Sequence, residues 1–458
     1  MNTPEISVGI LTAIEICFRL NAPYRLCGTE DIFTGEGKAT ISNDGKISVF
    51  FTSSLTEKAN PSCLIEADNT EMIEFEPVEP GNADFDLYDV VIGLQFHWER
   101  KENQRFKGTL KFIADAGSLV AVNILSIEDY LVSVISSEMS ATSSPEFLKA
   151  HAVISRGWLL AQKEKASGLH QSGSAYNSVT ETTDEYCCWY DREDHKLFDV
   201  CADDHCQRYQ GITKAYTKTT EEAVGSTAGE VMTYQGTICD TRFYKCCGGV
   251  TEKFENNWEP VVHPYLTRVE DCEAGADHNA PDLTKEEEAE RWIRSAPPSF
   301  CNTNDKDVLS QVLNDYDQET TTFYRWKVTL TQEQISDLIR RKTGRDFGDI
   351  IDLIPVERGC SGRIMRLKII GSKKIFIIGK ELFIRKALSE SHLYSSAFIV
   401  EKAYNTGDIP SIFTLTGAGW GHGSGLCQIG AAVMGEKGYN YKEILTHYFK
   451  DAILEKIY

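Results

Sequence analysis

The chain has 458 residues, of which 41% are hydrophobic, and a formal net charge of -21 at pH 7. It is too long for one ordinary domain, and its composition is sufficient for a sizeable core. The negative charge argues against nucleic acid or an anionic membrane surface as a partner, and no apolar run approaches the length of a transmembrane helix.

The N-terminal residues 1–18 contain no basic segment and no small-residue cleavage site, and acidic residues interrupt their apolar run. We therefore expect no export signal in this sequence and a cytoplasmic location. The periplasm or cell envelope is the alternative for a chain from which an export signal has been removed.

Strands are expected to dominate residues 1–120. Alternation of apolar and polar residues marks 46–51 and 88–96, and turn residues separate such segments. Residues 107–124 predict a hairpin that turns at Ala116-Gly117.

A helix is predicted over residues 129–139. Val134 belongs to its apolar stripe, and Glu138 follows four residues later on the same side. A carboxylate in such a place is costly unless it is paired, hydrated or functional. Desolvation raises the pKa of a carboxylic acid, as a general acid near neutral pH requires. Glu138 is therefore a candidate catalytic acid; the alternative is that the helix ends here and Glu138 faces solvent.

A second helix is predicted to begin at Ser144-Pro145-Glu146, which supplies an N-cap, a proline at the first helical position and an early acid. Apolar residues surround this helix as far as residue 162, so we expect it to be buried. Arg156 lies in its middle and needs an anionic partner or ligand, because its guanidinium stays charged. A structural salt bridge and a substrate contact are both open.

Residues 130–160, with their S-E-M, P-x-x-x-L-K-A and A-V-x-x-R elements, resemble the stage II sporulation protein D/amidase-enhancer (SpoIID/LytB) family. Proteins of that family are lytic transglycosylases acting on the glycan strands of peptidoglycan. The resemblance implies that Glu138 matches the catalytic glutamate and Arg156 an active-site arginine.

Fourteen cysteines are present, but Cys187-Cys188 and Cys246-Cys247 are adjacent pairs. Adjacent cysteines rarely bridge to each other, so reduced thiols or metal ligands are expected rather than a disulfide scaffold.

Two imidazoles and two thiols fall within twelve positions, at His195, Cys201, His205 and Cys206. Nitrogen and sulfur donors in this number suit tetrahedral zinc. Buried cysteines and surface histidines would also account for the spacing. The resemblance favours zinc, because a clostridial branch of the sporulation proteins is similar here in the same order and carries zinc. A single acid already accounts for the chemistry, so the zinc is expected to be structural, with a catalytic zinc as the alternative.

Residues 231–244 predict a second hairpin, and the following sequence YKCCGGVTE resembles the family signature Tyr-x-small-small-Gly-Gly-x-Thr-Glu, whose loop borders the active-site groove. The family commonly has small hydroxyl residues at the positions of Cys246 and Cys247. Tyr244 and Lys245 are candidate substrate-binding residues. A glycine hairpin with exposed polar residues is the alternative.

Residues 417–431 (GAGWGHGSGLCQIGA) closely resemble the family signature G-x-G-H-G-x-G-x-x-Q-x-G-A, the most specific match in the chain. His422 and Gln428 are candidate substrate-binding residues. No Lys-Ser/Thr follows, which excludes a P-loop. Cys427 stands where the family usually has serine, so a Cys427–His422 pair with peptidase-like chemistry is a rival interpretation.

The expected fold class is α+β with several domains and a long substrate groove. The expected divisions are a β-rich N-terminal domain (1–120), a mixed catalytic core (121–271), an acidic helical insertion (272–322) and a C-terminal α/β part (323–458) that completes the groove. Trp258, in the core, is a candidate wall for stacking on a sugar ring.

The resemblance implies cleavage of the bond between N-acetylmuramic acid and N-acetylglucosamine with formation of a 1,6-anhydro end. Glu138 would act first as acid and then as base, without the second carboxylate that hydrolytic glycosidases ordinarily use. The partners would be glycan strands or muropeptides, and no organic cofactor is expected. The alternatives are a non-catalytic glycan binder that recruits an N-acetylmuramoyl-alanine amidase and a muramidase-type hydrolase.

Overall fold

The computed structural model describes residues 3–51, 63–67, 72–93, 99–140, 143–172, 177–189, 195–203, 205–213, 218–273, 275, 280–312 and 321–458. The chain forms two compact units, and each unit combines segments that are distant in sequence. The first unit contains Met1–Ala141, Asp194–Gly229 and Ile457–Tyr458, and the second contains Thr142–Glu193 and Glu230–Lys456. The expected division into four consecutive domains stays a prediction.

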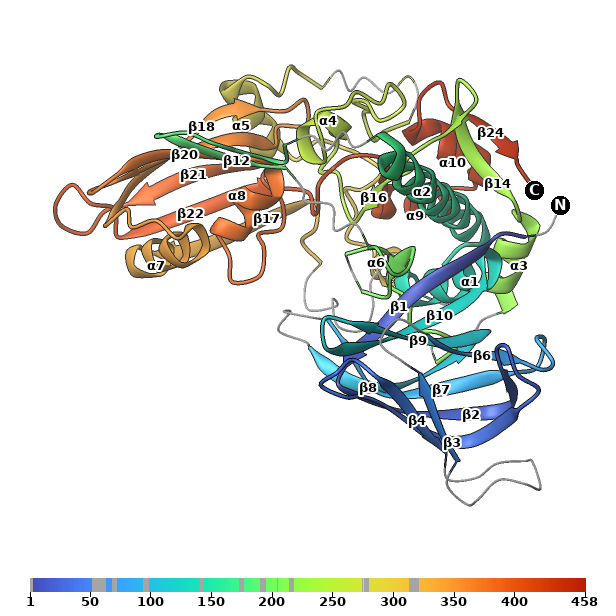
Figure 1. The fold of residues 1–458 in the computed structure, drawn as a ribbon. Coiled ribbons are helices and arrows are strands. Elements are labelled where there is room, and N and C mark those ends of the chain that lie inside the picture. Colours follow the sequence, from blue (N-terminus) through green and yellow to red (C-terminus); the bar gives the residue numbers. More distant parts are fainter. Residues whose placement is uncertain are drawn as a thin grey trace. The chain divides into compact units, whose positions relative to one another are not determined.

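The first unit is built on an 11-stranded sheet (Figure 1). Its strands are β1 (Glu5–Ala13), β2 (Glu15–Leu26), β3 (Ile32–Ile41), β4 (Ile47–Phe51), β5 (Cys63–Ala67), β6 (Ile73–Pro77), β7 (Asp84–Ile92), β8 (Arg100–Lys107), β9 (Thr109–Asp115), β10 (Ser118–Ser126) and β13 (Val200–Cys201). The order is β13-β1-β10-β9-β6-β2-β3-β4-β5, while β7 pairs with β2 and β8. Buried aromatic rings fill the interior: the Phe18 ring lies 5.5 Å from Phe51 and 5.2 Å from Phe112.

The predicted hairpin is confirmed. Strands β9 and β10 pair antiparallel, with Ser118 opposite Asp115. Ala116 and Gly117 both have positive φ, 46° and 82°, as a two-residue hairpin turn requires.

Two helices complete the first unit, α1 (Ile127–Glu138) and α3 (Lys218–Ser226), and they contact each other. The Ser126 side chain caps α1 by accepting a hydrogen bond from the Asp129 backbone N–H. Most of α1 is buried, as its apolar stripe predicts.

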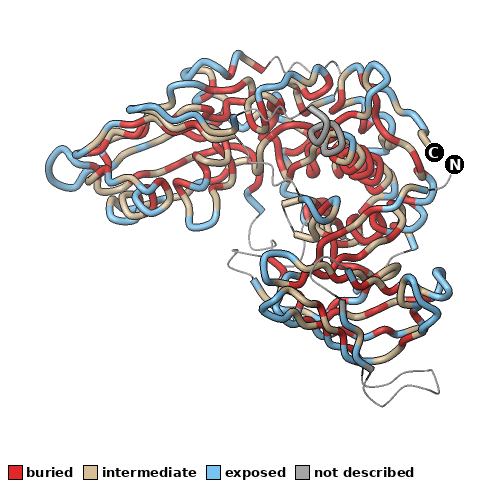
Figure 2. Tube along the Cα trace, in the orientation of Figure 1, coloured by how far each residue is buried: buried red, intermediate tan, exposed pale blue. Residues whose placement is uncertain are grey.

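The second unit contains the long helix α2 (Pro145–Ser172), and Figure 2 shows buried residues along most of its described length. Helix α2 contacts β14 (Glu230–Tyr234), β15 (Thr237–Ile238), α9 (Gln428–Glu436) and α10 (Tyr441–Tyr448), and β24 (Ile453–Lys456) pairs with β14. The predicted hairpin within residues 231–244 forms between β14 and β15, so its second strand is only Thr237–Ile238. Residues Phe243–Tyr244 instead form β16, which runs parallel to β23 (Leu426–Cys427).

The rest of the second unit contains two further sheets. One has the order β11 (Val179–Glu181), β12 (Glu185–Cys188), β20 (Ile375–Gly379), β19 (Ile364–Gly371), β18 (Ile350–Arg358), and the other β17 (Arg325–Thr331), β22 (Ile412–Ala418), β21 (Phe398–Ala403). Helices α7 (Gln332–Thr343) and α8 (Glu381–Ala387) contact these strands, and residues of both sheets and both helices share one hydrophobic core. Shorter helices are α4 (Phe254–Asn257), α5 (Glu286–Ser295) and α6 (Lys306–Val312).

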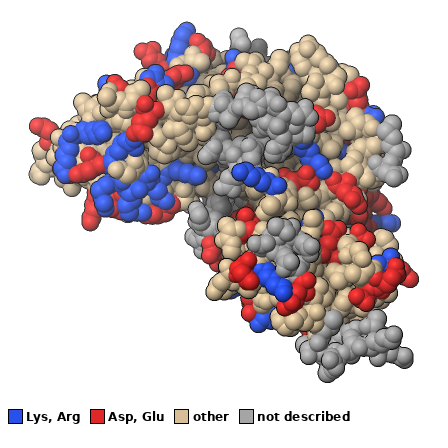
Figure 3. Space-filling model, in the orientation of Figure 1, with Lys and Arg blue, Asp and Glu red and all other residues tan. Residues whose placement is uncertain are grey.

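The fold is thus α+β with several sheets and a β-rich N-terminal part, as expected. Among the described residues, no helix is both long and apolar enough to cross a membrane. On the face shown in Figure 3, basic side chains gather over the part that contains α7, whose last turn carries Arg340, Arg341 and Lys342. Asp337 pairs with both arginines, which offsets part of this local charge.

Candidate functional site

Glu138 is the last residue of α1 and is half-buried. Its carboxylate oxygen Oε1 accepts a hydrogen bond of 3.1 Å from the backbone N–H of Arg208. The loop that carries Arg208 is itself anchored within the first unit, because the Ser133 hydroxyl on α1 donates to the Gly211 carbonyl at 2.7 Å. The carboxylate is therefore oriented by a backbone donor from a loop that is tied to its own helix.

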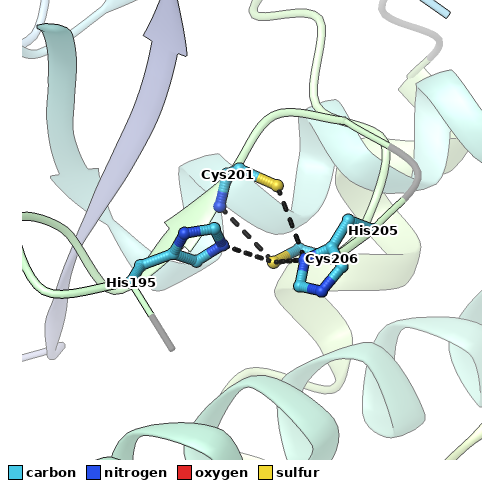
Figure 4. A group of neighbouring side chains, drawn as sticks. All are labelled: His195, Cys201, His205 and Cys206. Atoms are coloured by element: carbon cyan, nitrogen blue, oxygen red, sulfur yellow. Dashed lines mark hydrogen bonds between the residues drawn. The ribbon is translucent and has the colours of Figure 1, made fainter. Parts of the chain in front are cut away.

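The four predicted metal ligands converge just before this loop segment (Figure 4). One ligand atom from each of His195, Cys201, His205 and Cys206 lies within 4.8 Å of the others. The Cys206 sulfur is 3.4 Å from Nε2 of His195 and 3.5 Å from Nδ1 of His205. A hydrogen bond with Cys206 lowers the pKa of Cys201 to about 2, and both histidines act in the same direction. This donor set and its compactness fit a tetrahedral metal ion.

Two buried tyrosines, one on α1 and one on this loop, stack on each other. The Tyr130 ring stacks 5.1 Å from Tyr209, and the Tyr209 hydroxyl donates to Asn123 at 2.5 Å. The Tyr130 hydroxyl is buried and has no hydrogen-bond partner among the described residues. Burial raises its pKa well above the usual range, and the charges of Cys206, Cys201 and Glu138 add to that shift. Tyr130 therefore borders both the acid and the metal cluster.

The glycine-rich signature of the second unit brings together three predicted residues. The His422 ring lies 5.1 Å from the Tyr244 ring and 4.9 Å from the Trp258 ring. Nε2 of His422 donates to the Phe243 carbonyl, and Nδ1 accepts from the Ser424 N–H at 3.1 Å. Burial, followed by the charge of Arg242, lowers the pKa of His422 well below its usual value. The imidazole is thus neutral, and its two backbone hydrogen bonds fix the ring beside Tyr244 and Trp258.

Tyr244 has a buried hydroxyl without a hydrogen-bond partner among the described residues, and burial raises its pKa well above the usual range. Lys245, next to it, is half-buried and directs its ammonium group at the Val312 carbonyl. An unpaired buried hydroxyl is uncommon in a folded protein, so this position suits a polar contact to a ligand.

Arg156 and Gln428 are both buried in the second unit. Arg156 is fully buried in α2 and donates to the Glu230 carbonyl at 3.0 Å. Gln428, at the start of α9, is 3% exposed, and its amide nitrogen lies 3.2 Å from Nε2 of His151. The substrate-binding role of both residues stays a prediction, and their burial favours a positioning role.

The rival Cys427–His422 pair is not formed. Both ring nitrogens of His422 bond to backbone groups, and the fully buried Cys427 sulfur accepts from the Cys247 N–H at 3.2 Å. None of these hydrogen bonds joins the Cys427 thiol to the His422 imidazole, as a cysteine peptidase pair requires.

Several residues of these sites were missed from the sequence. Tyr130 lies eight residues before Glu138 on the same helical stripe, which is a periodicity signal that could have identified it. Arg208 reaches Glu138 through its backbone N–H, which any residue could supply, and His151 is one of many residues of a buried helix, so neither carries a sequence signal.

Comparison with known proteins finds two family models and several relatives. Residues 115–234 match the family model described as stage II sporulation protein, and residues 252–425 match a domain of unknown function (DUF8618). Stage II sporulation protein D of Bacillus amyloliquefaciens is 25% identical over 72% of this chain and 74% of its own length. An uncharacterized protein of Brachyspira hyodysenteriae is 26% identical over 75% of this chain and 70% of its own.

A shorter match is the amidase enhancer of Bacillus subtilis, which is 24% identical over 54% of this chain and 34% of its own length. The acid-bearing helix and the histidine–cysteine cluster both fall within the matched residues 115–234. Residues 115–234 thus match the stage II sporulation protein family, and relatives named stage II sporulation protein D and amidase enhancer are similar to this chain.

Proposed function

We propose that this protein has a cell-wall-related function and is a peptidoglycan lytic transglycosylase with Glu138 as its single acid and base. The observation that carries the proposal is the hydrogen bond from the Arg208 N–H to Oε1 of Glu138. It orients a half-buried carboxyl group at a helix end that the family model covers. The family match and the names of the relatives support the cell-wall-related function.

In the proposed reaction, the Glu138 carboxylic acid donates its proton to the glycosidic oxygen between N-acetylmuramic acid and N-acetylglucosamine. The bond to the anomeric carbon breaks, and the N-acetylglucosamine side leaves as an alcohol. The Glu138 carboxylate then takes the proton from the muramic six-position hydroxyl, whose oxygen bonds to the anomeric carbon. The products are an anhydro end and a restored acid, so water is not consumed.

The histidine–cysteine cluster is proposed to hold zinc with a structural role. The two thiols and two imidazoles are of the types and number that zinc favours, and they lie within one ion's reach of each other. When bound, the zinc would place a positive charge between the two thiolates of one short loop and link them to the two imidazoles. That loop continues to Arg208, so its rigidity would keep the backbone donor aimed at Glu138.

Residues of the second unit are proposed to bind the sugar. The Tyr244 hydroxyl offers a polar contact, and the His422 and Trp258 rings offer apolar faces. Arg156, Lys245 and Gln428 would set the position of these groups or meet the lactyl carboxylate.

The test compares wild-type protein with Glu138→Gln on peptide-stripped glycan strands, using mass spectrometry to detect anhydro-ended fragments. The amide cannot donate and retake the proton, so product formation should fall by at least about 100-fold while glycan binding and the melting temperature are kept. The matched control is Glu221→Gln, which changes an exposed glutamate on α3 and should leave activity unchanged.

Normal turnover by Glu138→Gln would refute the assignment. Products heavier by one water would instead indicate a muramidase. Glycan binding by the wild-type protein without any cleavage, together with stimulation of an added amidase, would establish the amidase enhancer in its place.

A further inference from the structure

A second cluster of metal-binding side chains lies in the second unit, outside the groups assigned above. Sulfur atoms of Cys247, Cys301 and Cys427 and a carboxylate oxygen of Asp271 all lie within 4.8 Å of one another. The four residues are at most 2% exposed. They come from four separate segments, so no sequence motif groups them.

The distances fit one shared ion. The Cys247 sulfur is 3.3 Å from the Cys301 sulfur and 3.3 Å from Oδ2 of Asp271. A disulfide bond is about 2.05 Å long, so the two sulfurs are not bonded to each other. Zinc–sulfur bonds of about 2.3 Å place two thiolates of a tetrahedral site roughly 3.8 Å apart. A cluster of this size therefore surrounds a single ion rather than a multinuclear centre.

Backbone donors already point at the sulfurs and the carboxylate. The Cys247 N–H donates to the Cys427 sulfur at 3.2 Å, and the Gly249 N–H donates to the Cys247 sulfur at 3.3 Å. The Cys301 N–H donates to Oδ2 of Asp271 at 3.0 Å. Such donors stabilise thiolate and carboxylate anions and are usual around bound metal ions.

The buried carboxylate lacks a cation that would balance it. Asp271 is fully buried, and within the described ranges no lysine or arginine lies within 4 Å of it. Its other oxygen accepts from the Tyr448 hydroxyl at 2.6 Å, and Nε2 of His447 is 3.9 Å away. Burying an ionised carboxylate among three thiols is costly unless it takes up a proton or a positive charge lies there.

The glycine at position 430 leaves room for the Asp271 carboxylate and the Tyr448 hydroxyl. A side chain at Gly430 would come within 2.6 Å of the Asp271 carboxylate and 2.3 Å of the Tyr448 hydroxyl. Cys246, Cys247 and Cys427 are also the positions at which the two signatures depart from the small hydroxyl residues usual in the family. Two of these three departures are ligands of the cluster, and Cys246 lies against Cys301 and Cys427.

We propose that Cys247, Cys301, Cys427 and Asp271 form a second zinc site, which joins the two signature loops of the second unit. Three sulfur ligands and one oxygen ligand, with no open position, make this a structural site. The ion ties Cys247, beside Tyr244 and Lys245, to Cys427, beside Gln428, so it fixes the proposed sugar-binding loops.

The test measures zinc per chain by inductively coupled plasma mass spectrometry on the full-length protein purified under reducing conditions. Cys301→Ala should contain about one zinc fewer than wild type. Cys239→Ala removes a fully buried cysteine outside the cluster and should contain as much zinc as wild type. His195→Ala combined with Cys206→Ala disrupts the first cluster and should keep the zinc that Cys301→Ala loses.

X-ray absorption at the zinc edge of the wild-type protein gives a readout that no variant's folding affects. Occupation of both clusters gives an average of roughly 2.5 sulfur ligands per zinc, and the first cluster alone gives about two. Equal zinc in wild type and Cys301→Ala, a two-sulfur average, iron in place of zinc, or a Cys247–Cys301 disulfide in the alkylated protein would each overturn the proposal.

Discussion

Individual buried histidines make the stability of this protein sensitive to acid. His151 is fully buried in α2, where Nδ1 contacts the Ser155 hydroxyl and Nε2 accepts from the Gln428 amide, both at 3.2 Å. Burial, followed by the charge of Lys245, lowers the pKa of His151 to about 3. A histidine in the unfolded chain titrates near 6.5, so the unfolded state binds a proton between pH 6.5 and 3 that the folded state does not.

The free energy of unfolding should therefore fall as the pH falls from 6.5 towards 3, by up to about 1.4 kcal/mol per pH unit for this group. We expect wild type to lose about 2 kcal/mol more than His151→Gln between pH 7 and pH 5. Urea unfolding of both proteins at the two pH values measures this difference. Equal losses would show that His151 titrates normally in the folded state.

Among single structural elements, the glycine-rich signature loop of the second unit is held by close backbone contacts. Gly425 has φ +93°, and a side chain there would come within 2.1 Å of the Arg242 carbonyl. Arg363, which is fully buried, donates two hydrogen bonds to the Gly421 carbonyl, at 3.1 and 3.0 Å. The loop is thus fixed from two sides.

Gly425→Ala should therefore lower the free energy of unfolding by about 3 kcal/mol or more, through strain and steric overlap. Gly438→Ala is a matched control, because Gly438 has φ +87° with no atom within 4 Å of the added carbon. It should cost only about 1–2 kcal/mol from the left-handed conformation. Chemical denaturation of the two variants gives the comparison, and similar losses would contradict the steric contribution.

Local elements were predictable from sequence, and long-range pairings were not. The Ala116-Gly117 hairpin depends on neighbouring residues, so its signal lies within a few positions. The parallel pairing of Phe243–Tyr244 with Leu426–Cys427 joins segments about 180 residues apart, and neither carries a mark of the other.

The candidate sites follow the same division. His195, Cys201, His205 and Cys206 are close in sequence, and their residue types together with the family resemblance predicted the cluster that the structure assembles. Cys301 belongs to no motif, so only the fold brings it to Cys247 and Cys427.

The whole molecule carries a formal net charge of -21, so repulsion among its acidic groups opposes the folded state. Exposed ion pairs such as Arg19–Glu36 contribute little, because solvent screens them. Raising NaCl from 0.01 to 0.15 M shortens the screening length from about 30 to about 8 Å and weakens the repulsion. The melting temperature should therefore rise over this range, as measured by differential scanning fluorimetry. A fall in the melting temperature would mean that the loss of ion-pair attraction outweighs the loss of net-charge repulsion. A sugar at matched osmolality controls for general solute effects.

The path of the chain between the units also bears on how the protein is made. During synthesis Glu138 emerges first, and residues Thr142–Glu193 of the second unit follow it. Arg208, which belongs to the first unit, emerges 70 residues after Glu138. Strand β1 likewise cannot pair with β13 until the same segment of the second unit has been synthesised. A nascent chain halted before residue 208 would carry the acid without the donor that orients it. The orientation of the Glu138 carboxyl group is thereby delayed until much of the polypeptide has emerged.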